Sequence, residues 1–305
     1  MPQVVSVSIT PVILSALRFI YAYHHLTVKQ VAEMVRMTPK AASDMLLRLE
    51  RGQLLGFFGN VGIRGYGKTP KVYFLTRTGH RVLGEELAAI GEGLGPYRQI
   101  KMNTRWSPLM YHRIATVDVL SYVERDCTAL KDYRLLGTLL EYRRERVGNR
   151  WRQETTDYVA EPHGADTRIV PDAGFALEHR ASGKCALFLI EVDRGTTPLL
   201  SDQPETEVKS VVAKLGQYDR YLASRRVANR YPDLGTYSGF HLLFVTTSGA
   251  RVANLRAAAS ASLNPAFHHL YRFSTLEAAS HNLLHDAWLS RDHADHTTYR
   301  LIKGS

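Results

Sequence analysis

Three acidic residues stand at the ends of apolar segments in the middle of the chain. Asp172 follows Pro171, and Glu191 and Asp193 end the segment Cys185 to Asp193, which otherwise contains no charge. An ionised carboxylate at the end of a buried strand is costly unless a metal, hydrogen bonds or a cation compensates it. Two antiparallel strands joined by a tight turn can place Asp172 near Glu191. Such carboxylates suit Mg²⁺ or Mn²⁺, which polarises a phosphodiester, so we expect a metal on Asp172, Glu191 and Asp193.

Each of these acids also has a simpler interpretation. Asp172 can be a cap and Glu191 a solvated strand end. Asp193 can form a local ion pair with the adjacent Arg194, which contributes little if it is exposed. The sequence leaves these alternatives open.

A cation and a nucleophile for the same chemistry can come from the segment that follows. Lys214 borders the apolar face of an expected helix, where it can stabilise charge on a phosphate or simply extend its stem along apolar surface. Tyr218 is one turn further on, as a candidate nucleophile or as a core residue. Glu141 can approach the carboxylate pair, and His112 can contact phosphate or act as a general acid, or be an ordinary boundary histidine.

The elements that must position these residues follow an α/β pattern. We expect helices over 108–127 and 205–225, and strands over 134–146, 167–179, 185–193 and 239–247. The strand 185–193 is almost continuously apolar, as in a strand buried on both faces. The last two strands should be parallel and joined by a right-handed crossover.

The first ninety residues predict a winged helix, an α+β unit in which a helix-turn-helix precedes a β-hairpin. Thr27 and Gln30 form a capping box, and Thr38 with Pro39 begins the later helix. That helix has an apolar stripe on one face and a basic outer face suited to the major groove. Strands over 54–58 and 71–76 enclose a glycine-rich wing. The expected DNA-binding residues are Lys40, Ser43, Arg48, Arg51, Arg64, Lys68 and Lys71.

Charge and composition point the same way. The 305 residues carry a formal net charge of +10, and residues 1–80 hold ten basic and three acidic residues, which favours a polyanion partner. Two cysteines exclude a disulfide framework and a four-thiolate zinc site. No apolar stretch reaches 18 residues, and the N-terminus lacks the basic region of a secretion signal. We expect a cytoplasmic protein that does not bind membranes.

Two resemblances extend this interpretation. Pro171-Asp172 followed by Glu191-x-Asp193 resembles the PD-(D/E)xK nuclease superfamily, with Asp193 where the third motif normally has lysine. The segments PDAGFALE (171–178), FLIEVDRGT (188–196) and KLGQYDRYL (214–222), with Tyr111-His112, resemble the replication-relaxation family of plasmids and integrative elements. That resemblance implies a winged helix ahead of a restriction-endonuclease-like domain, and nicking or relaxing of double-stranded DNA at a transfer or replication origin with Mg²⁺ or Mn²⁺.

Two functions therefore remain. The chain is either a metal-dependent nickase or relaxase, or a non-enzymatic DNA-binding regulator or accessory factor with a degenerate nuclease-like domain. The domains expected are a winged helix over 1–95, a linker over 96–107 and an α/β restriction-endonuclease-like domain over 108–305. Double-stranded DNA is the expected partner; other mobilisation or replication proteins and a homodimer are further candidates, although no heptad pattern indicates a dimer.

Overall fold

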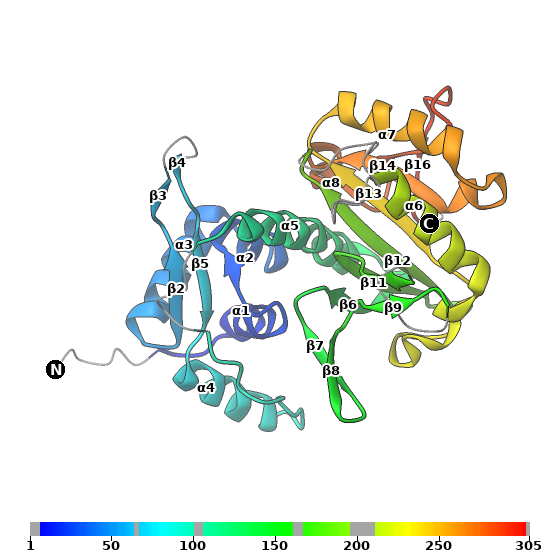
Figure 1. The fold of residues 1–305 in the computed structure, drawn as a ribbon. Coiled ribbons are helices and arrows are strands. Elements are labelled where there is room, and N and C mark those ends of the chain that lie inside the picture. Colours follow the sequence, from blue (N-terminus) through cyan, green and yellow to red (C-terminus); the bar gives the residue numbers. More distant parts are fainter. Residues whose placement is uncertain (1–6, 64–66, 101–105, 161–166, 196–210, 303–305) are drawn as a thin grey trace. The chain divides into compact units, whose positions relative to one another are not determined.

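The computed structural model describes residues 7–63, 67–100, 106–160, 167–195 and 211–302. The chain contains both helices and strands, and the strands form several sheets. It divides into two compact units, Met1–Ser121 and Tyr122–Ser305 (Figure 1). The division lies within helix α5 (Pro108–Ala129). The linker expected over 96–107 stays a prediction, and residues 101–105 lie outside the described part.

Four helices of the first unit begin where threonine side chains cap them. They are α1 (Pro11–Ala22), α2 (Val28–Met34), α3 (Pro39–Arg51) and α4 (Arg77–Ala88). The predicted capping box is present at α2, where Thr27 accepts from the backbone of Gln30 and the Gln30 side chain accepts from the backbone of Thr27. The Thr38 side chain accepts from the backbone of Ala41 and so begins α3.

A small antiparallel sheet completes the first unit. Strands β1 (Leu26–Thr27), β5 (Lys71–Leu75) and β2 (Leu55–Gly59) lie in that order, and β3 (Gly62–Ile63) pairs with β4 (Gly67–Lys68) between β2 and β5. The residues between β3 and β4 are outside the described part. The four residues predicted for the apolar stripe of α3 are all buried: Ala42, Met45, Leu46 and Leu49.

The second unit is built on a seven-stranded sheet with the order β16-β15-β14-β13-β12-β11-β6. Its strands are β6 (Tyr133–Leu140), β11 (Ala173–His179), β12 (Lys184–Asp193), β13 (His241–Thr246), β14 (Tyr271–Thr275), β15 (Trp288–Leu289) and β16 (Thr298–Tyr299). Pairing is antiparallel from β6 to β12, parallel from β12 to β14, and antiparallel beyond. The predicted parallel pair, β12 and β13, is confirmed.

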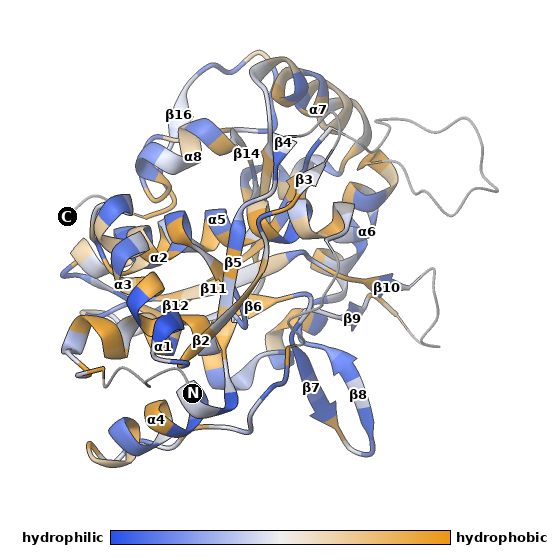
Figure 2. Cartoon of the chain, turned by 90° about the vertical axis from the view of Figure 1, so that its left-hand side faces the viewer, coloured by the Kyte–Doolittle hydropathy of each residue, from blue (hydrophilic) through white to orange (hydrophobic). Residues whose placement is uncertain are grey.

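Helices and short strands surround this sheet. The helices are α6 (Val211–Ser224), α7 (Gly249–Ser262) and α8 (Leu276–Asn282), with 3₁₀ turns at Arg226–Asn229, Pro232–Leu234 and Pro265–Leu270. The short strands are β7 (Arg144–Val147), β8 (Arg150–Gln153), β9 (Asp157–Tyr158) and β10 (Arg168–Ile169). Figure 2 shows the hydrophobic colour concentrated along the sheet, whereas β7 and β8 are hydrophilic.

Several predicted elements differ in extent. The single strand expected over 134–146 ends at Leu140, because β11 begins opposite it at Ala173 and leaves no partner strand beyond. The chain turns there and forms the β7–β8 hairpin. The strand expected over 167–179 is two strands, β10 and β11, and Asp172 lies just before β11.

Candidate functional site

The predicted acids of β12 lie on the face of the sheet that α6 covers. Side chains alternate along a strand, and Leu187 and Leu189 share a core cluster with Leu215 of α6. Glu191 and Asp193 continue that alternation and therefore point toward the same helices. Both are buried, with exposed fractions of 2% and 6%. The interpretation of Glu191 as a solvated strand end is wrong.

Strand register brings Asp172 beside Glu191. Ala173 of β11 is opposite Ile190 of β12, so the next residues outward, Asp172 and Glu191, face each other. The backbone N–H of Asp172 donates to the Ile190 carbonyl at 3.1 Å, and one carboxylate oxygen of Asp172 accepts from the backbone of Val192 at 2.8 Å. The tight β11–β12 connection therefore places the two carboxylates on one face, as the sequence indicated.

Helix α6 supplies two polar groups to Glu191. Lys214 donates to one carboxylate oxygen of Glu191, and Tyr218, one turn later, donates to the other. Tyr218 is fully buried. The second residue after Glu191 is Asp193, and the cation beside Glu191 comes from α6, the helix between the parallel strands β12 and β13.

The electrostatics of this group are those of a buried, crowded site. Burial raises the pKa of Glu191; Lys214 opposes that rise and Asp172 adds to it. Burial alone would lower the pKa of Lys214, but the surrounding carboxylates, Glu191 first, raise it. The pKa of Tyr218 is raised well above its ordinary value by burial and by Glu191. Lys214 is thus held as a cation and Tyr218 as a neutral hydroxyl.

Asp193 has a separate cation that sequence reasoning missed. One of its carboxylate oxygens accepts from Nε of Arg251 on α7 at 2.7 Å, and the other accepts from the backbone of Gly195 at 2.9 Å. Gly195 has a φ of +78°, a conformation that glycine adopts without strain, and this lets the chain turn back at the end of β12. Because Arg251 is 58 residues from Asp193, no local pattern indicated the pair.

In the part of the chain that the structure describes, the two remaining catalytic candidates, Glu141 and His112, make no contact with Glu191 that places them in this group. Glu141 continues the row formed by Asp172 and Glu191, since its backbone N–H donates to the carbonyl of Asp172, but its side chain accepts from Gln153 of β8. His112 is half-buried on the part of α5 that belongs to the first unit, and its carbonyl accepts from Thr116.

The candidate DNA-binding residues of the first unit have two different surroundings. Lys40, Ser43, Arg48 and Arg51 are all exposed on α3, and Lys68 is exposed on β4. Lys71 is half-buried instead, with its ammonium 2.5 Å from Glu50 and 3.8 Å from the centre of the Phe57 ring. Lys71 therefore links β5 to Glu50 of α3 and to the Phe57 ring of β2. Arg64 lies outside the described residues.

A family model described as replication-relaxation matches residues 17–235, which is more than half of the chain. The chain belongs to the replication-relaxation family. Comparison with curated proteins and with solved structures found no match. The matched range of this replication-relaxation protein includes α3, Asp172, Glu191 and α6, whereas α7 with Arg251 follows it.

Two carboxylates of this replication-relaxation protein suit a hard divalent cation. Mg²⁺ commonly takes one or two protein carboxylates, and the charge of Asp172 acts directly on buried Glu191. Arg251 and Gly195 engage both oxygens of Asp193, just as Lys214 and Tyr218 engage both oxygens of Glu191, so a cation on either acid would have to share or displace these partners. Among the residues that the structure describes, no group of three or more His, Cys, Asp and Glu is arranged to hold a metal ion. A metal here would rest on Asp172 and Glu191.

Proposed function

We propose that this replication-relaxation protein is a cytoplasmic DNA-binding protein that acts at a transfer or replication origin as a metal-dependent nickase or relaxase. Family membership supports the role in replication or mobilisation. The described part of the chain has no helix long and apolar enough to cross a membrane. The observation that carries the proposal is the contact of Lys214 with buried Glu191, opposite Asp172.

The first unit supports duplex binding as a winged helix. Helix α3 follows α2 after a brief turn and exposes Lys40, Arg48 and Arg51, while its apolar stripe is buried. A helix of this kind can enter the major groove, where basic side chains position the phosphates. Strands β3 and β4, with Lys68 exposed, form the base of the wing between β2 and β5.

The second unit supports a restriction-endonuclease-like site with a relocated lysine. Asp172 and Glu191 would hold Mg²⁺ or Mn²⁺, which lowers the pKa of bound water and stabilises charge on a phosphodiester when it is present. Lys214 neutralises Glu191 and would orient the phosphate. Tyr218 positions Glu191 through its hydroxyl. Its burial and raised pKa disfavour Tyr218 as the nucleophile, and this leaves water as the attacking group.

A supercoiled plasmid that carries the DNA flanking the gene tests this proposal. Wild-type protein with Mn²⁺ or Mg²⁺ should convert it to open circles, and chelation should stop the conversion. Asp172→Asn, Glu191→Gln and Lys214→Met should each abolish conversion. Glu178→Gln is the matched control, because Glu178 lies on β11 toward its other end and pairs there with Arg134. Nicking that survives in the Asp172 and Glu191 variants would contradict the proposal.

A non-enzymatic DNA-binding regulator or accessory factor is the second candidate. It is favoured by the replacement of the motif lysine by Asp193 and by the pairing of that acid with Arg251. In this case the paired acids would serve only to hold α6 and α7 against the sheet. A duplex gel shift by wild-type protein without any nicking in either metal would favour this function. Partner proteins and a homodimer remain predictions in both cases.

A further inference from the structure

The β7–β8 hairpin projects from the second unit beyond the end of β6 (Figure 1). Its register pairs Arg144 with Gln153 and Arg146 with Trp151, and its two-residue turn has a φ of +58° at Gly148. Glycine at the first turn position suits a tight hairpin. Neither strand joins the large sheet, so the hairpin is not required to complete it.

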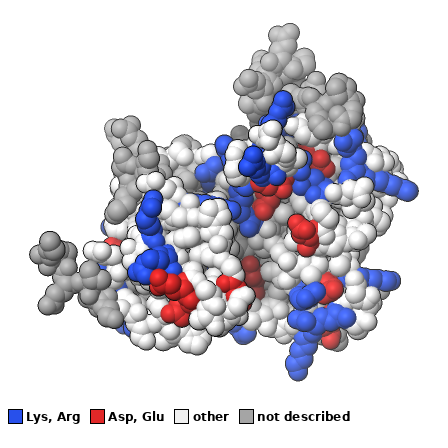
Figure 3. Space-filling view, turned by 90° about the horizontal axis from the view of Figure 1, so that it is seen from below, with Lys and Arg blue, Asp and Glu red and all other residues white. Residues whose placement is uncertain are grey.

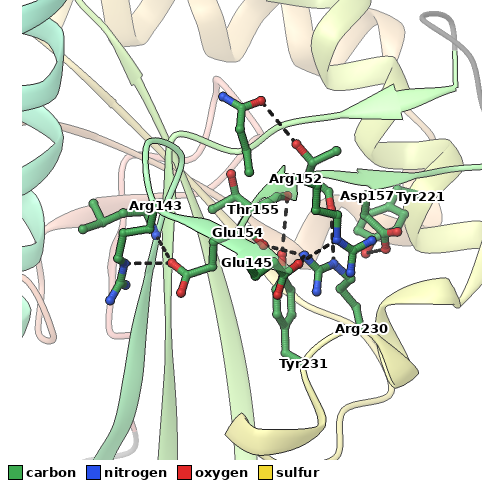
Figure 4. A network of polar contacts seen from close by, with 12 residues as sticks. Arg143, Glu145, Arg152, Glu154, Thr155, Asp157, Tyr221, Arg230 and Tyr231 are labelled. Carbon is green, nitrogen blue, oxygen red and sulfur yellow. Dashed lines mark hydrogen bonds and ion pairs between the residues drawn. The ribbon is translucent and has the colours of Figure 1, made fainter. Parts of the chain in front are cut away.

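Buried polar contacts fix the base of this hairpin (Figure 4). Arg230 is 8% exposed, and its guanidinium donates to Glu145 at 2.6 Å and to the carbonyl of Glu154 at 2.5 Å. Arg152 also pairs with Glu145 at 2.6 Å, and Arg143 pairs with Glu154 at 2.9 Å. Because the buried guanidinium of Arg230 donates both to a carboxylate and to a backbone carbonyl, it links the two ends of the hairpin to the rest of the unit. The hairpin therefore extends from the fold on a rigid base.

The two faces of the hairpin differ in their side chains. Residues opposite each other in an antiparallel pair point to the same side, so Arg144, Arg146 and Trp151 share one face, while Glu145 and Arg152 share the other. Arg144, Arg146 and Trp151 are exposed, with an exposed fraction of 66% for Trp151, whereas Gln153 at the base of the same face is half-buried. Among the described residues no acidic side chain pairs with Arg144 or with Arg150 near the turn. We call Arg144, Arg146 and Trp151 the hairpin face.

An exposed indole between guanidinium groups contributes little to the fold, but it suits one kind of ligand. Residues 143–153 contain five arginines and one acid, Glu145, so the field around Trp151 favours a polyanion. In the view from below, the direction in which the hairpin points in Figure 1, Lys and Arg side chains form clusters on the surface (Figure 3). Aromatic side chains between phosphate-contacting cations stack on bases, and a base offers its face only when it is unstacked.

We propose that the hairpin face binds single-stranded DNA, with Trp151 stacked on an unpaired base and Arg144 and Arg146 on the flanking phosphates. This inference rests on the proposed function in one respect, namely that the chain meets DNA at an origin. It adds a second DNA contact, separate from α3 and from the acids of β12. The hairpin would hold the strand that becomes unpaired there.

Fluorescence anisotropy with the full chain tests this, using a labelled 16-nucleotide single strand and a duplex of the flanking DNA. Trp151→Ala should weaken single-strand binding by roughly 5- to 100-fold and leave duplex binding unchanged. Trp151→Phe should retain part of the affinity and Trp151→Leu should not, because leucine is apolar but cannot stack. Ile90→Ala is the control, since Ile90 is 58% exposed and lies apart from the hairpin in sequence.

The arginines give a second readout. The double variant Arg144→Gln with Arg146→Gln should reduce the slope of log K against log salt by about 1.4 for the single strand. The double variant Arg81→Gln with Arg300→Gln removes the same charge from two exposed sites and should leave that slope unchanged. Most of the quenching of tryptophan fluorescence on binding should disappear in Trp151→Phe, since Trp288 is buried and Trp106 is half-buried against the core of the first unit.

Several outcomes would overturn the inference. Wild-type binding to the duplex but not to the single strand removes it and leaves the proposed function intact. Single-strand affinity that is equal in wild type, Trp151→Ala and Trp151→Leu also removes it. An equal loss of duplex and single-strand binding in Trp151→Ala would make the hairpin a duplex contact. Binding to neither DNA would remove the proposed function as well.

Discussion

Helix α3 and the end of β12 both carry the charges that sequence reasoning selected, yet the fold treats them in opposite ways. On α3 the cations Lys40, Arg48 and Arg51 remain in solvent, and the helix is held by its apolar stripe. At β12 the acids Glu191 and Asp193 are buried, and each is neutralised by a cation from another helix.

This difference teaches what each region contributes. Solvated cations cost the fold almost nothing and are available for phosphates, so their effect appears in DNA affinity. Buried acids require compensation, so their effect appears first in stability and then in any chemistry that displaces the compensating group. The four predictions below separate these two roles, from the largest expected effect on stability to the smallest.

Lys214→Met should have the largest effect. The change leaves Glu191 buried without its half-buried cation, and a buried charge left without its partner costs about 3 kcal/mol of unfolding free energy. Urea unfolding followed by circular dichroism measures it. Glu191→Gln combined with Lys214→Met should recover a large part of the loss, because no buried charge then remains. A loss below about 0.5 kcal/mol for Lys214→Met would contradict this prediction, because it would show that Glu191 behaves as a solvated carboxylate.

Buried His25 and half-buried His241 test whether desolvation of a side chain, rather than the unit that contains it, decides its effect on stability. His25 in the first unit and His241 in the second both have a pKa lowered to about 4, mainly by burial, with Arg113 acting on His25 and Arg272 with His269 on His241. Between pH 6.5 and 4 the unfolded chain takes up protons that the folded chain excludes. The stability that the protein has with these two histidines neutral is therefore complete above pH 6.5 and is lost as the pH falls toward 4.

His25→Asn and His241→Asn should each lose less stability than wild type between pH 7 and pH 5. Urea midpoints at the two pH values measure this difference, which excludes any packing loss common to both. His268→Asn, from an exposed position in the second unit, is the control and should behave as wild type. An unchanged pH dependence in one variant would show that its histidine is solvated in the native state.

Thr38→Ala tests how α3 is held. The Thr38 side chain accepts from the backbone of Ala41, and loss of such a cap costs about 1 kcal/mol. Thr38→Ser should retain the cap and the stability. Thr38→Ala should lower the stability in any case. It should also lower the duplex affinity only if fraying of the first turn displaces Lys40. Thermal unfolding and duplex anisotropy, measured together, distinguish these effects.

Arg48→Gln should have the smallest effect on stability and a clear effect on binding. Arg48 is exposed, so unfolding free energy should change by less than about 0.5 kcal/mol. The slope of log K against log salt for the duplex should fall by about 0.9 if Arg48 contacts one phosphate. Lys71→Gln should do the reverse, with lower stability and an unchanged slope, because Lys71 pairs with Glu50.

Local patterns predicted a large part of the first unit. The Thr27–Gln30 capping box, the Thr38 cap and the buried stripe of α3 all depend on contacts within four residues, so the sequence displays them directly. The apolar run of β12 is also visible in the sequence, whereas its parallel pairing with β13 joins distant residues such as Phe188 and His241 and was predicted from the helix expected between the two strands. The end of the strand expected over 134–146 could not be found in this way, because Leu140 is the last residue only as a result of where β11 begins.

The candidate site shows the same limit. Spacing selected two pairs, Asp172 with Glu191 across a tight turn and Lys214 with Tyr218 one helical turn apart, but only the packing of α6 on the sheet brought the two pairs together. The contacts and exposure of Asp193, Lys71 and Trp151 could be seen only in the folded chain. Arg251 reaches Asp193 from a helix that follows β13, and Arg230 anchors the β7–β8 hairpin across a sequence distance of 85 residues from Glu145.

The sequence by itself therefore determined the principal helices and strands as far as β13, which of their faces are apolar, and which charges are candidates for chemistry. Only the tertiary structure decided which charges stay in solvent and which are buried and paired. The physical reason is that secondary structure and capping arise from neighbours along the chain, whereas the cost of a charge depends on everything that the fold packs around it. For Glu191 that environment is Lys214, Tyr218 and Asp172, and for Trp151 it is solvent.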